Sequence, residues 1–184
     1  MTGAEVAAGT LPKEPAAGTR PTDIVVTRWG ARFLGRRLPC AIGRGGITRD
    51  KREGDGATPA GAHRIVGLLY RPDRMPRPVD WAVPIRPGDL WSDDPRDGDG
   101  YNTMVRAPHG FSHEVLRRAD PLYDAVLITD WNWPRAEAGR GSAIFVHLWR
   151  GPRVPTQGCV AFPRAAFGWM LPRIRYETRL VVRG

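Results

Sequence analysis

Short apolar runs alternate along the chain with polar stretches that are rich in glycine and proline. The clearest runs, AVLITD at 125–130 and AIFVHL at 143–148, are typical of buried strands because they are short and rich in β-branched residues. The same pattern predicts further strands at 23–29, 38–42, 63–70, 81–85, 158–162 and 178–183. The strand at 81–85 is expected at a sheet edge, because Pro84 has no N–H to donate to a neighbour.

Helical periodicity is sparse. Pro163 suits the first residue of a helix that runs to about Leu171, where Pro172 would end it. A second short helix is expected at 112–119, and the polar segments 48–62 and 89–102 are expected to be long loops. The pattern therefore predicts a mainly β fold with one or two short helices.

Residues 1–22 are rich in Ala, Gly, Thr and Pro and show no periodicity, which predicts a flexible N-terminal tail and one folded domain at 23–184. The N-terminus lacks a basic start followed by an apolar core, so no secretory signal is expected. The chain also contains no run of 18 apolar residues, so no transmembrane segment is expected.

The chain is basic, with a net charge of +9, and 26 of its 28 cationic residues are arginine. Genomic base composition accounts for such a bias, and so does an anionic partner such as a cell-wall polymer, a nucleic acid or a lipid surface. Arginine binds carboxylates and phosphates alike, so the charge alone does not identify the partner. No recognition helix or ribonucleoprotein motif is present, and nucleic acid is therefore not an expected partner.

A thiol and an imidazole lie twelve residues apart, at Cys159 and His147. Each has an ordinary explanation, since cysteine often packs as a small hydrophobic residue and histidine often ends a core strand. Gly158 nevertheless permits close approach of a substrate, and the N–H groups of 158 and 159 could bind an oxyanion. His147 ends a strand, and the loop after it can return Cys159 to the same rim, where the imidazole would act as base.

The loop between them supplies the other candidates. Thr156 and Gln157 make the approach to Cys159 polar, and nearby arginines, including Arg150, Arg153 and Arg164, would favour the thiolate. No Asp, Glu or Asn lies between 147 and 159, so a backbone carbonyl such as that of Leu148 is expected to orient His147. Glu114 and Tyr123 are further candidates for a cleft, against a solvated helix face and a packed aromatic ring.

The histidines at 63, 109 and 113 show no metal-ligand spacing with Cys159, so neither a metal nor another cofactor is expected. Two cysteines do not make a disulfide framework, and Cys40 is expected to be structural.

The pattern His-loop-Thr-x-Gly-Cys-Val at 147–160 resembles the catalytic segment of the L,D-transpeptidase family, the YkuD-type domain. The stretch GDGATPAGAHRIV from Gly54 is similar to the Thr-Pro-x-Gly segment of that family, and the resemblance covers about 25–183. It implies a mixed β-sandwich or barrel-like fold, Cys159 as nucleophile, His147 as general base and Gly158 beside the oxyanion site. Thr156 matches the hydroxyl position ahead of Gly-Cys.

The chain departs from the family pattern at three points. Gln157 stands where many members have His, Ala161 stands where an Arg is common, and the spacing from His to Cys is short. Arg150 is expected to supply the missing guanidinium, so Thr156, Arg150 and Gln157 are the predicted substrate-binding residues.

The resemblance implies a monomeric enzyme that acts on peptidoglycan stem peptides through a thioester, is open to inhibition by carbapenems and works in the cell envelope or periplasm. A cytoplasmic location stays open because no export signal is visible. An L,D-carboxypeptidase or a D-amino-acid exchange enzyme would use the same site, since only the acceptor differs. A non-enzymatic binder of an anionic polymer is the remaining alternative.

Overall fold

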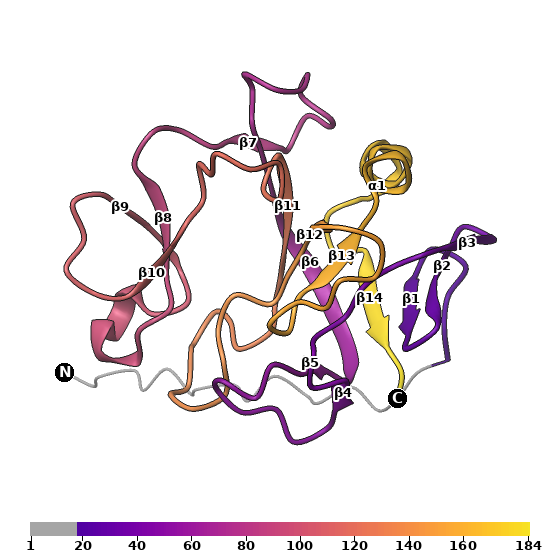
Figure 1. Ribbon diagram of the computed structural model, residues 1–184, viewed down its shortest axis with the longest axis horizontal. Helices are drawn as coiled ribbons and strands as arrows, with labels where there is room; N and C mark the ends of the chain where they lie inside the picture. Colours follow the sequence, from indigo (N-terminus) through magenta and orange to yellow (C-terminus); the bar gives the residue numbers. More distant parts are fainter. Residues whose placement is uncertain (1–17) are drawn as a thin grey trace, which may run out of the picture.

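The computed structural model describes residues 18–184, and a large, strongly curved β-sheet organises it (Figure 1). Residues 1–17 of the predicted tail at 1–22 lie outside the described residues. Across the sheet the strands follow the order β13 (Val160–Phe162), β12 (Phe145–Leu148), β11 (Ala125–Thr129), β6 (Gly61–Tyr70), β14 (Arg179–Val182), β1 (Ile24–Thr27), β2 (Gly30–Phe33) and β3 (Arg36–Leu38), with β7 (Val83–Pro84) paired to β6.

The two edges of this sheet approach each other through the segment that follows β3. Ala41 lies antiparallel to Ala161 of β13, and their N–H and C=O groups exchange hydrogen bonds of 2.8 and 2.9 Å. A closed sheet leaves few unpaired backbone groups. The fold is therefore mainly β and nearly closed into a barrel, as predicted.

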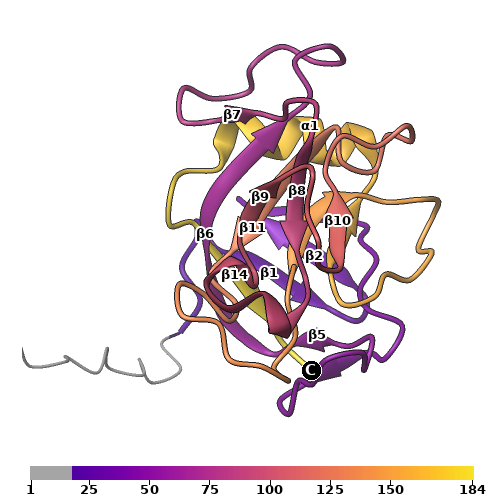
Figure 2. The ribbon, with the colours of Figure 1, turned by 90° about the vertical axis from the view of Figure 1, so that its left-hand side faces the viewer.

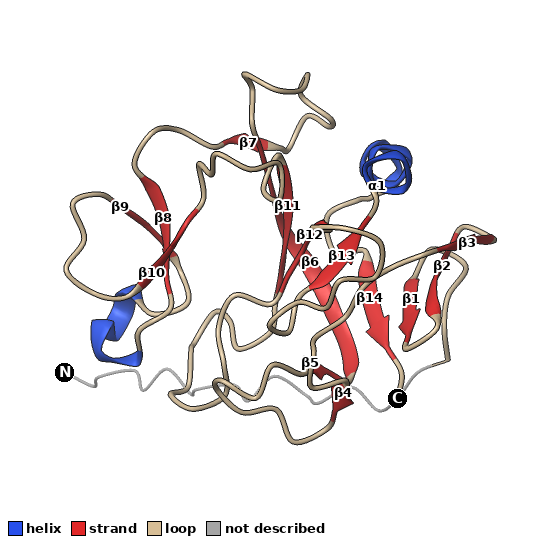
Figure 3. Ribbon diagram, in the orientation of Figure 1, coloured by secondary structure: helices blue, strands red, loops and turns tan. Residues whose placement is uncertain are grey.

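Two smaller sheets and the helices complete the structure. A three-stranded sheet, β10 (His113–Val115), β8 (Asp89–Ser92) and β9 (Met104–Arg106), lies against one side of the large sheet (Figures 1 and 2). Strand β4 (Ile47–Thr48) pairs with β5 (Thr58–Pro59). The helices are η1 (Pro95–Gly100), α1 (Arg164–Met170) and η2 (Leu171–Arg173), and Figure 3 shows how little of the described chain they occupy.

Alternation along the central strands separates two apolar cores. Val146 and Leu148 of β12 point into the larger core, together with Val160 and Phe162 of β13. Phe145 points to the opposite side, into a smaller core that lies between the large sheet and β8–β10. Successive side chains of a strand face opposite ways, so His147 shares the side of Phe145. The candidate site thus lies toward the smaller core.

The predicted strands at 23–29, 63–70, 125–130, 143–148, 158–162 and 178–183 are confirmed within a few residues, and 81–85 is confirmed as the two-residue edge strand β7. The helix predicted at 112–119 is wrong, because that segment forms β10. A helix so short does not stabilise itself, whereas the free edge of β8 offers it ladder hydrogen bonds.

The polar segment 89–102 is also more than the predicted loop, since it begins with β8. Asp89 is tolerated in a buried strand because its carboxylate accepts hydrogen bonds from Arg106 Nη1 (2.6 Å) and the Arg86 N–H (2.6 Å). Residues 48–62 contain β5 and the first residues of β6, and the predicted strand at 38–42 is displaced to β3.

Candidate active site

Cys159 immediately precedes β13, and His147 lies in the neighbouring strand β12. The two strands run parallel, with His147 opposite Ala161 and Val146 opposite Val160. Continuing this register places Phe145 opposite Cys159, so alternation brings Cys159 and His147 to the same face, two residues apart along the strands. Cys159 packs against the smaller core, which includes Trp91, Tyr123 and Phe145.

The sulfur is half-buried and held by backbone groups. Cys159 Sγ donates to the Ala143 carbonyl oxygen (3.1 Å) and accepts from the Phe145 N–H (3.4 Å). Burial raises the pKa of Cys159 to about 12, and the nearby Glu114 carboxylate acts in the same direction. The Phe145 N–H and the Lys51 ammonium oppose this rise without cancelling it. At neutral pH the group is a thiol.

The imidazole of His147 is buried and oriented by the chain itself. Nδ1 lies 2.7 Å from the Leu148 carbonyl oxygen, which can only accept, so Nδ1 carries the proton and Nε2 keeps its lone pair. The Tyr123 ring meets the imidazole edge-on at 5.3 Å. Burial lowers the pKa of His147 to about 4, with a smaller contribution in the same direction from Arg118. The predicted orientation by the Leu148 carbonyl is confirmed.

The free site therefore holds a neutral thiol beside a neutral imidazole. Both hydrogen-bond partners of the sulfur are backbone groups, and within residues 18–184 no hydrogen bond joins it to His147. The expectation that arginines lower the thiol pKa is wrong. Arg153 donates instead to the Trp29 carbonyl, Arg164 pairs with Asp124, and the cation that acts on the sulfur is Lys51.

Gly158 owes its identity to a tight turn. Its φ of 141° is rarely adopted by residues with a side chain, and a Cβ there would lie 2.9 Å from the Ala57 carbonyl oxygen. The Gly158 N–H donates to Thr156 Oγ1 (3.1 Å), and this hydroxyl donates to the Cys159 carbonyl oxygen (2.6 Å). The first bond occupies one of the two amides that the oxyanion prediction would use, which leaves the Cys159 N–H.

Thr58 lies in the Thr-Pro-x-Gly segment, the second stretch that carries the family resemblance. This segment contacts the Gly-Cys turn directly. The buried Thr58 hydroxyl donates to the Gly158 carbonyl oxygen (2.8 Å) and accepts from the Gly43 N–H (2.9 Å). One side chain therefore fixes three chain segments at the turn that carries the thiol.

Ala143, whose carbonyl oxygen accepts the hydrogen bond from the thiol, also has a constrained backbone conformation. Ala143 has a positive φ of 51°, which costs energy in a residue with a Cβ. Its N–H donates to Asn102 Oδ1 (3.0 Å), and Asn102 Nδ2 donates to the Asn132 carbonyl oxygen (2.8 Å). Asn102, also at positive φ, thus positions the loop opposite the sulfur. The sequence gives no hint of this contact, because Asn102 looks like the end of a turn.

The remaining predicted residues are placed as follows. The Thr156 hydroxyl is engaged in the hydrogen bonds of the turn. Arg150 and Gln157 are exposed on the loop between β12 and β13. Arg150 acts electrostatically on Asp120, whose pKa is lowered mainly by its hydrogen bond to Arg118. Residues 18–184 contain no group of three or more His, Cys, Asp or Glu that could hold a metal ion.

One carboxylate, that of Glu114, and one ammonium group, that of Lys51, act on the sulfur from distant segments of the chain. Tyr123 Oη donates to Glu114 Oε2 (3.3 Å), which places this carboxylate near the sulfur. Lys51 is buried and forms an ion pair with Asp55 (2.6 Å). Glu114 and Tyr123 were sequence candidates, but Lys51 was not, because it lies in a polar stretch that is predicted to be a loop.

A model of the L,D-transpeptidase catalytic domain, YkuD, matches residues 24–182, which is most of the chain. The chain belongs to the L,D-transpeptidase family. No match was found among curated proteins or among solved structures. The match spans the nearly closed sheet, Thr58, His147 and Cys159, so the family assignment and the observed fold agree.

Enzymes of the L,D-transpeptidase family generally act on peptidoglycan peptides and are typically associated with the cell envelope. Within residues 18–184, no helix is long and apolar enough to cross a membrane.

Proposed function

We propose that the chain is a cysteine-dependent L,D-transpeptidase that acts on peptidoglycan stem peptides through a thioester acyl-enzyme. The observation that carries the proposal is the placement of Cys159 and His147 on one sheet face, with no hydrogen bond from residues 18–184 to the Nε2 lone pair of His147. A nucleophile and a base are what acyl transfer requires of side chains.

In the proposed reaction, Cys159 Sγ attacks a carbonyl of the stem peptide while the thiol proton leaves Ala143 and passes to His147 Nε2. The carbonyl oxygen becomes an oxyanion, and the Cys159 N–H is the amide available to bind it. The tetrahedral intermediate expels the terminal D-residue as an amine, which takes the proton from His147. An acceptor amine then attacks the thioester and passes a proton to Nε2. His147 returns this proton to the departing sulfur, which restores the thiol and the neutral imidazole.

Several other residues have proposed roles. Gly158 and Thr156 hold the turn, whereas Arg150 and Gln157, exposed on the adjoining loop, bind stem-peptide carboxylates. The Glu114 carboxylate, near the sulfur, suits the ammonium group of the acceptor. We further propose that residues 23–184 form one catalytic domain that works as a monomer in the cell envelope without a cofactor.

The test is incubation with a purified tetrapeptide stem and a mass analysis of the products. Cross-linked dimers are expected, together with a covalent adduct after exposure to a carbapenem. Truncated monomers alone would identify a carboxypeptidase, and incorporation of added D-amino acid would identify an exchange enzyme.

Two variants locate the chemistry. Cys159→Ala should abolish both the adduct and turnover, whereas Cys40→Ala should keep both, because Cys40 is a buried thiol on the other side of the sheet, in the larger core. An adduct that persists in Cys159→Ala would remove Cys159 from the role.

A further inference from the structure

The positive charge of this protein is concentrated in two segments of the sequence. Residues 24–49 and 138–176 together contain twelve arginines and no acidic residue, whereas residues 50–137 contain fifteen acidic and twelve basic residues. The first segment forms β1, β2 and β3, and the second contains β12, β13, α1 and the loop at 149–157. The isolated pairs Ala41–Ala161 and Gly43–Thr156 join the two segments in space.

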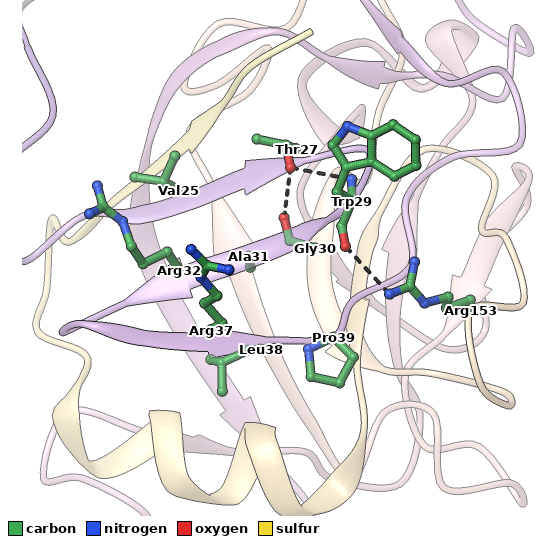
Figure 4. A pocket seen from close by; sticks show the side chains of 10 residues that line it. All are labelled: Val25, Thr27, Trp29, Gly30, Ala31, Arg32, Arg37, Leu38, Pro39 and Arg153. Carbon is green, nitrogen blue, oxygen red and sulfur yellow. Dashed lines mark hydrogen bonds between the residues drawn. The ribbon is translucent and has the colours of Figure 1, made fainter.

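A groove lies where these segments meet (Figure 4). It has a volume of about 560 Å³ and is lined mainly by the outward side chains of β1–β3, with Trp29 at the turn between β1 and β2. Val25 and Thr27 face the groove because the alternating residues Ile24 and Val26 are buried in the larger core. Arg32, Arg37 and Arg153 also line it.

The arginines along the groove have no ion-pair partner in the part of the chain that the structure describes. Among residues 18–184, no ion pair involves Arg32, Arg37 or Arg153, although surface arginines elsewhere on the molecule commonly have acidic partners. Charged guanidinium groups left together repel one another unless an anion lies between them. The groove therefore favours a ligand with several negative charges.

Trp29 adds a flat apolar surface beside these charges. Its side chain is 71% exposed, and the Arg28 guanidinium covers the ring at 4.4 Å from its centroid. Thr27 Oγ1 fixes the turn, because it accepts from the Trp29 N–H (3.2 Å) and donates to the Gly30 carbonyl oxygen (3.2 Å). A large indole held in water on a fixed turn is suited to stacking on a planar or ring-shaped ligand.

One loop connects this groove to the candidate active site. Arg153 Nη2 donates to the Trp29 carbonyl oxygen (3.4 Å), as Figure 4 shows. Three residues further along the same loop, Thr156 Oγ1 donates to the Cys159 carbonyl oxygen (2.6 Å). A long ligand that occupies the groove would therefore continue across the loop toward the thiol.

We propose that this groove binds the glycan strand of peptidoglycan, with a sugar ring on Trp29 and the carboxylates of neighbouring stem peptides on Arg32, Arg37 and Arg153. The proposal rests on the proposed function, since it gives the polymer that supplies the reacting stem peptide a second contact on the enzyme. Single-stranded nucleic acid is less well matched, because it usually binds along several aromatic side chains and the groove has one.

The test is co-sedimentation with purified peptidoglycan sacculi, in a Cys159→Ala background so that binding is measured without turnover. Replacement of two of the three groove arginines, Arg32→Gln with Arg37→Gln, should weaken binding about tenfold at low salt, and Trp29→Ala should weaken it at low and high salt alike. The matched control is Arg86→Gln with Arg135→Gln, which removes the same charge from exposed positions in the acidic half of the chain. It should bind like the parent.

Turnover separates this proposal from the proposed function. With Cys159 restored, the groove variants should lose cross-linking of sacculi but keep turnover of a soluble tetrapeptide stem, which carries no glycan strand to occupy the groove. Equal sedimentation of groove and control variants would overturn the glycan site, as would binding to single-stranded DNA with none to sacculi. A soluble stem left unchanged by the wild-type chain would instead overturn the proposed chemistry, and sedimentation would still decide the groove.

Discussion

The thiol of Cys159 and the imidazole of His147 are both uncharged at neutral pH, and burial is the cause in each case. Burial raises the pKa of the thiol to about 12 and lowers that of the imidazole to about 4. A preformed thiolate–imidazolium pair would require the opposite shifts. We therefore expect proton transfer to accompany attack on the substrate, with His147 acting as a general base.

This ionisation scheme predicts the pH dependence of carbapenem acylation. Below about pH 4 His147 is protonated and cannot accept the thiol proton, so the rate should rise with pH through that value and then stay level across neutrality. His147→Gln should lower the rate by about 100-fold or more and remove the acid limb. Stopped-flow rates measured from pH 3 to 9 would check this.

The control for that experiment is His113→Gln, which changes a partly exposed histidine of β10 and should leave the acid limb in place. A rate that falls already below pH 7 in the wild-type chain would contradict the buried, carbonyl-bound imidazole described above.

At the scale of the element, the Gly-Cys turn depends on two residues that never touch substrate in the proposed reaction. Gly158 provides a backbone conformation that places the thiol beside β12, and Thr58 bonds this turn to two other segments. Replacing either residue should shift the thiol and leave the rest of the fold largely unchanged.

Gly158→Ala should lower the free energy of unfolding by about 1–3 kcal/mol and slow acylation, because the new Cβ meets the Ala57 carbonyl at an unfavourable φ. Gly168→Ala is the matched control, since Gly168 lies inside α1 with no atom within 4 Å of its added Cβ. It should raise stability by about 0.5–1 kcal/mol. Urea unfolding measures both, and equal stability of the two variants would contradict the steric account.

Thr58→Val keeps the shape of the side chain but leaves the Gly43 N–H and the Gly158 carbonyl without their partner. The expected loss is about 2–4 kcal/mol, because both groups are deeply buried. Thr58→Ser retains the hydroxyl and should lose about 1 kcal/mol, the value of one methyl group. Thermal unfolding distinguishes them, and similar losses in both would show that packing, not hydrogen bonding, matters here.

The elements differ in how well the sequence predicted them. The central strands follow from their apolar runs, and the Gly-Cys turn follows from its motif. Strands β8 and β10 could not be predicted from the sequence. Asp89 looks like a loop residue and Glu114 like part of a solvated helix face until Arg106 and Tyr123 are placed beside them. The pKa shifts escaped prediction for the same reason, since proximity in sequence put Arg150 and Arg164 near the thiol and the fold put Lys51 there.

At the scale of the whole molecule, Asn102 links the three-stranded sheet to the loop that faces the sulfur. Its Oδ1 accepts from Trp91 Nε1 (3.1 Å) in β8 and from the Ala143 N–H (3.0 Å), and its Nδ2 donates to the Asn132 carbonyl oxygen. The smaller core and the loop therefore depend on one amide group.

Asn102→Gly should lower the free energy of unfolding by about 2–4 kcal/mol, because four partners lose their hydrogen bonds to the side chain while the positive φ stays permitted. Asn102→Ala should lose a further 1 kcal/mol or so from backbone strain. Urea unfolding followed by tryptophan fluorescence measures both losses. A loss below about 1 kcal/mol for the glycine variant would show that water replaces the amide.

The hydrogen bond from the thiol to the Ala143 carbonyl has a consequence for chemical durability. Oxidants and alkylating agents attack the thiolate. Cys159 keeps its proton at neutral pH, so little thiolate is present. We therefore expect Cys159 to resist oxidation to sulfenic acid in an oxidising medium. In the proposed reaction, the sulfur becomes reactive only when His147 takes the proton as the sulfur attacks a bound carbonyl carbon.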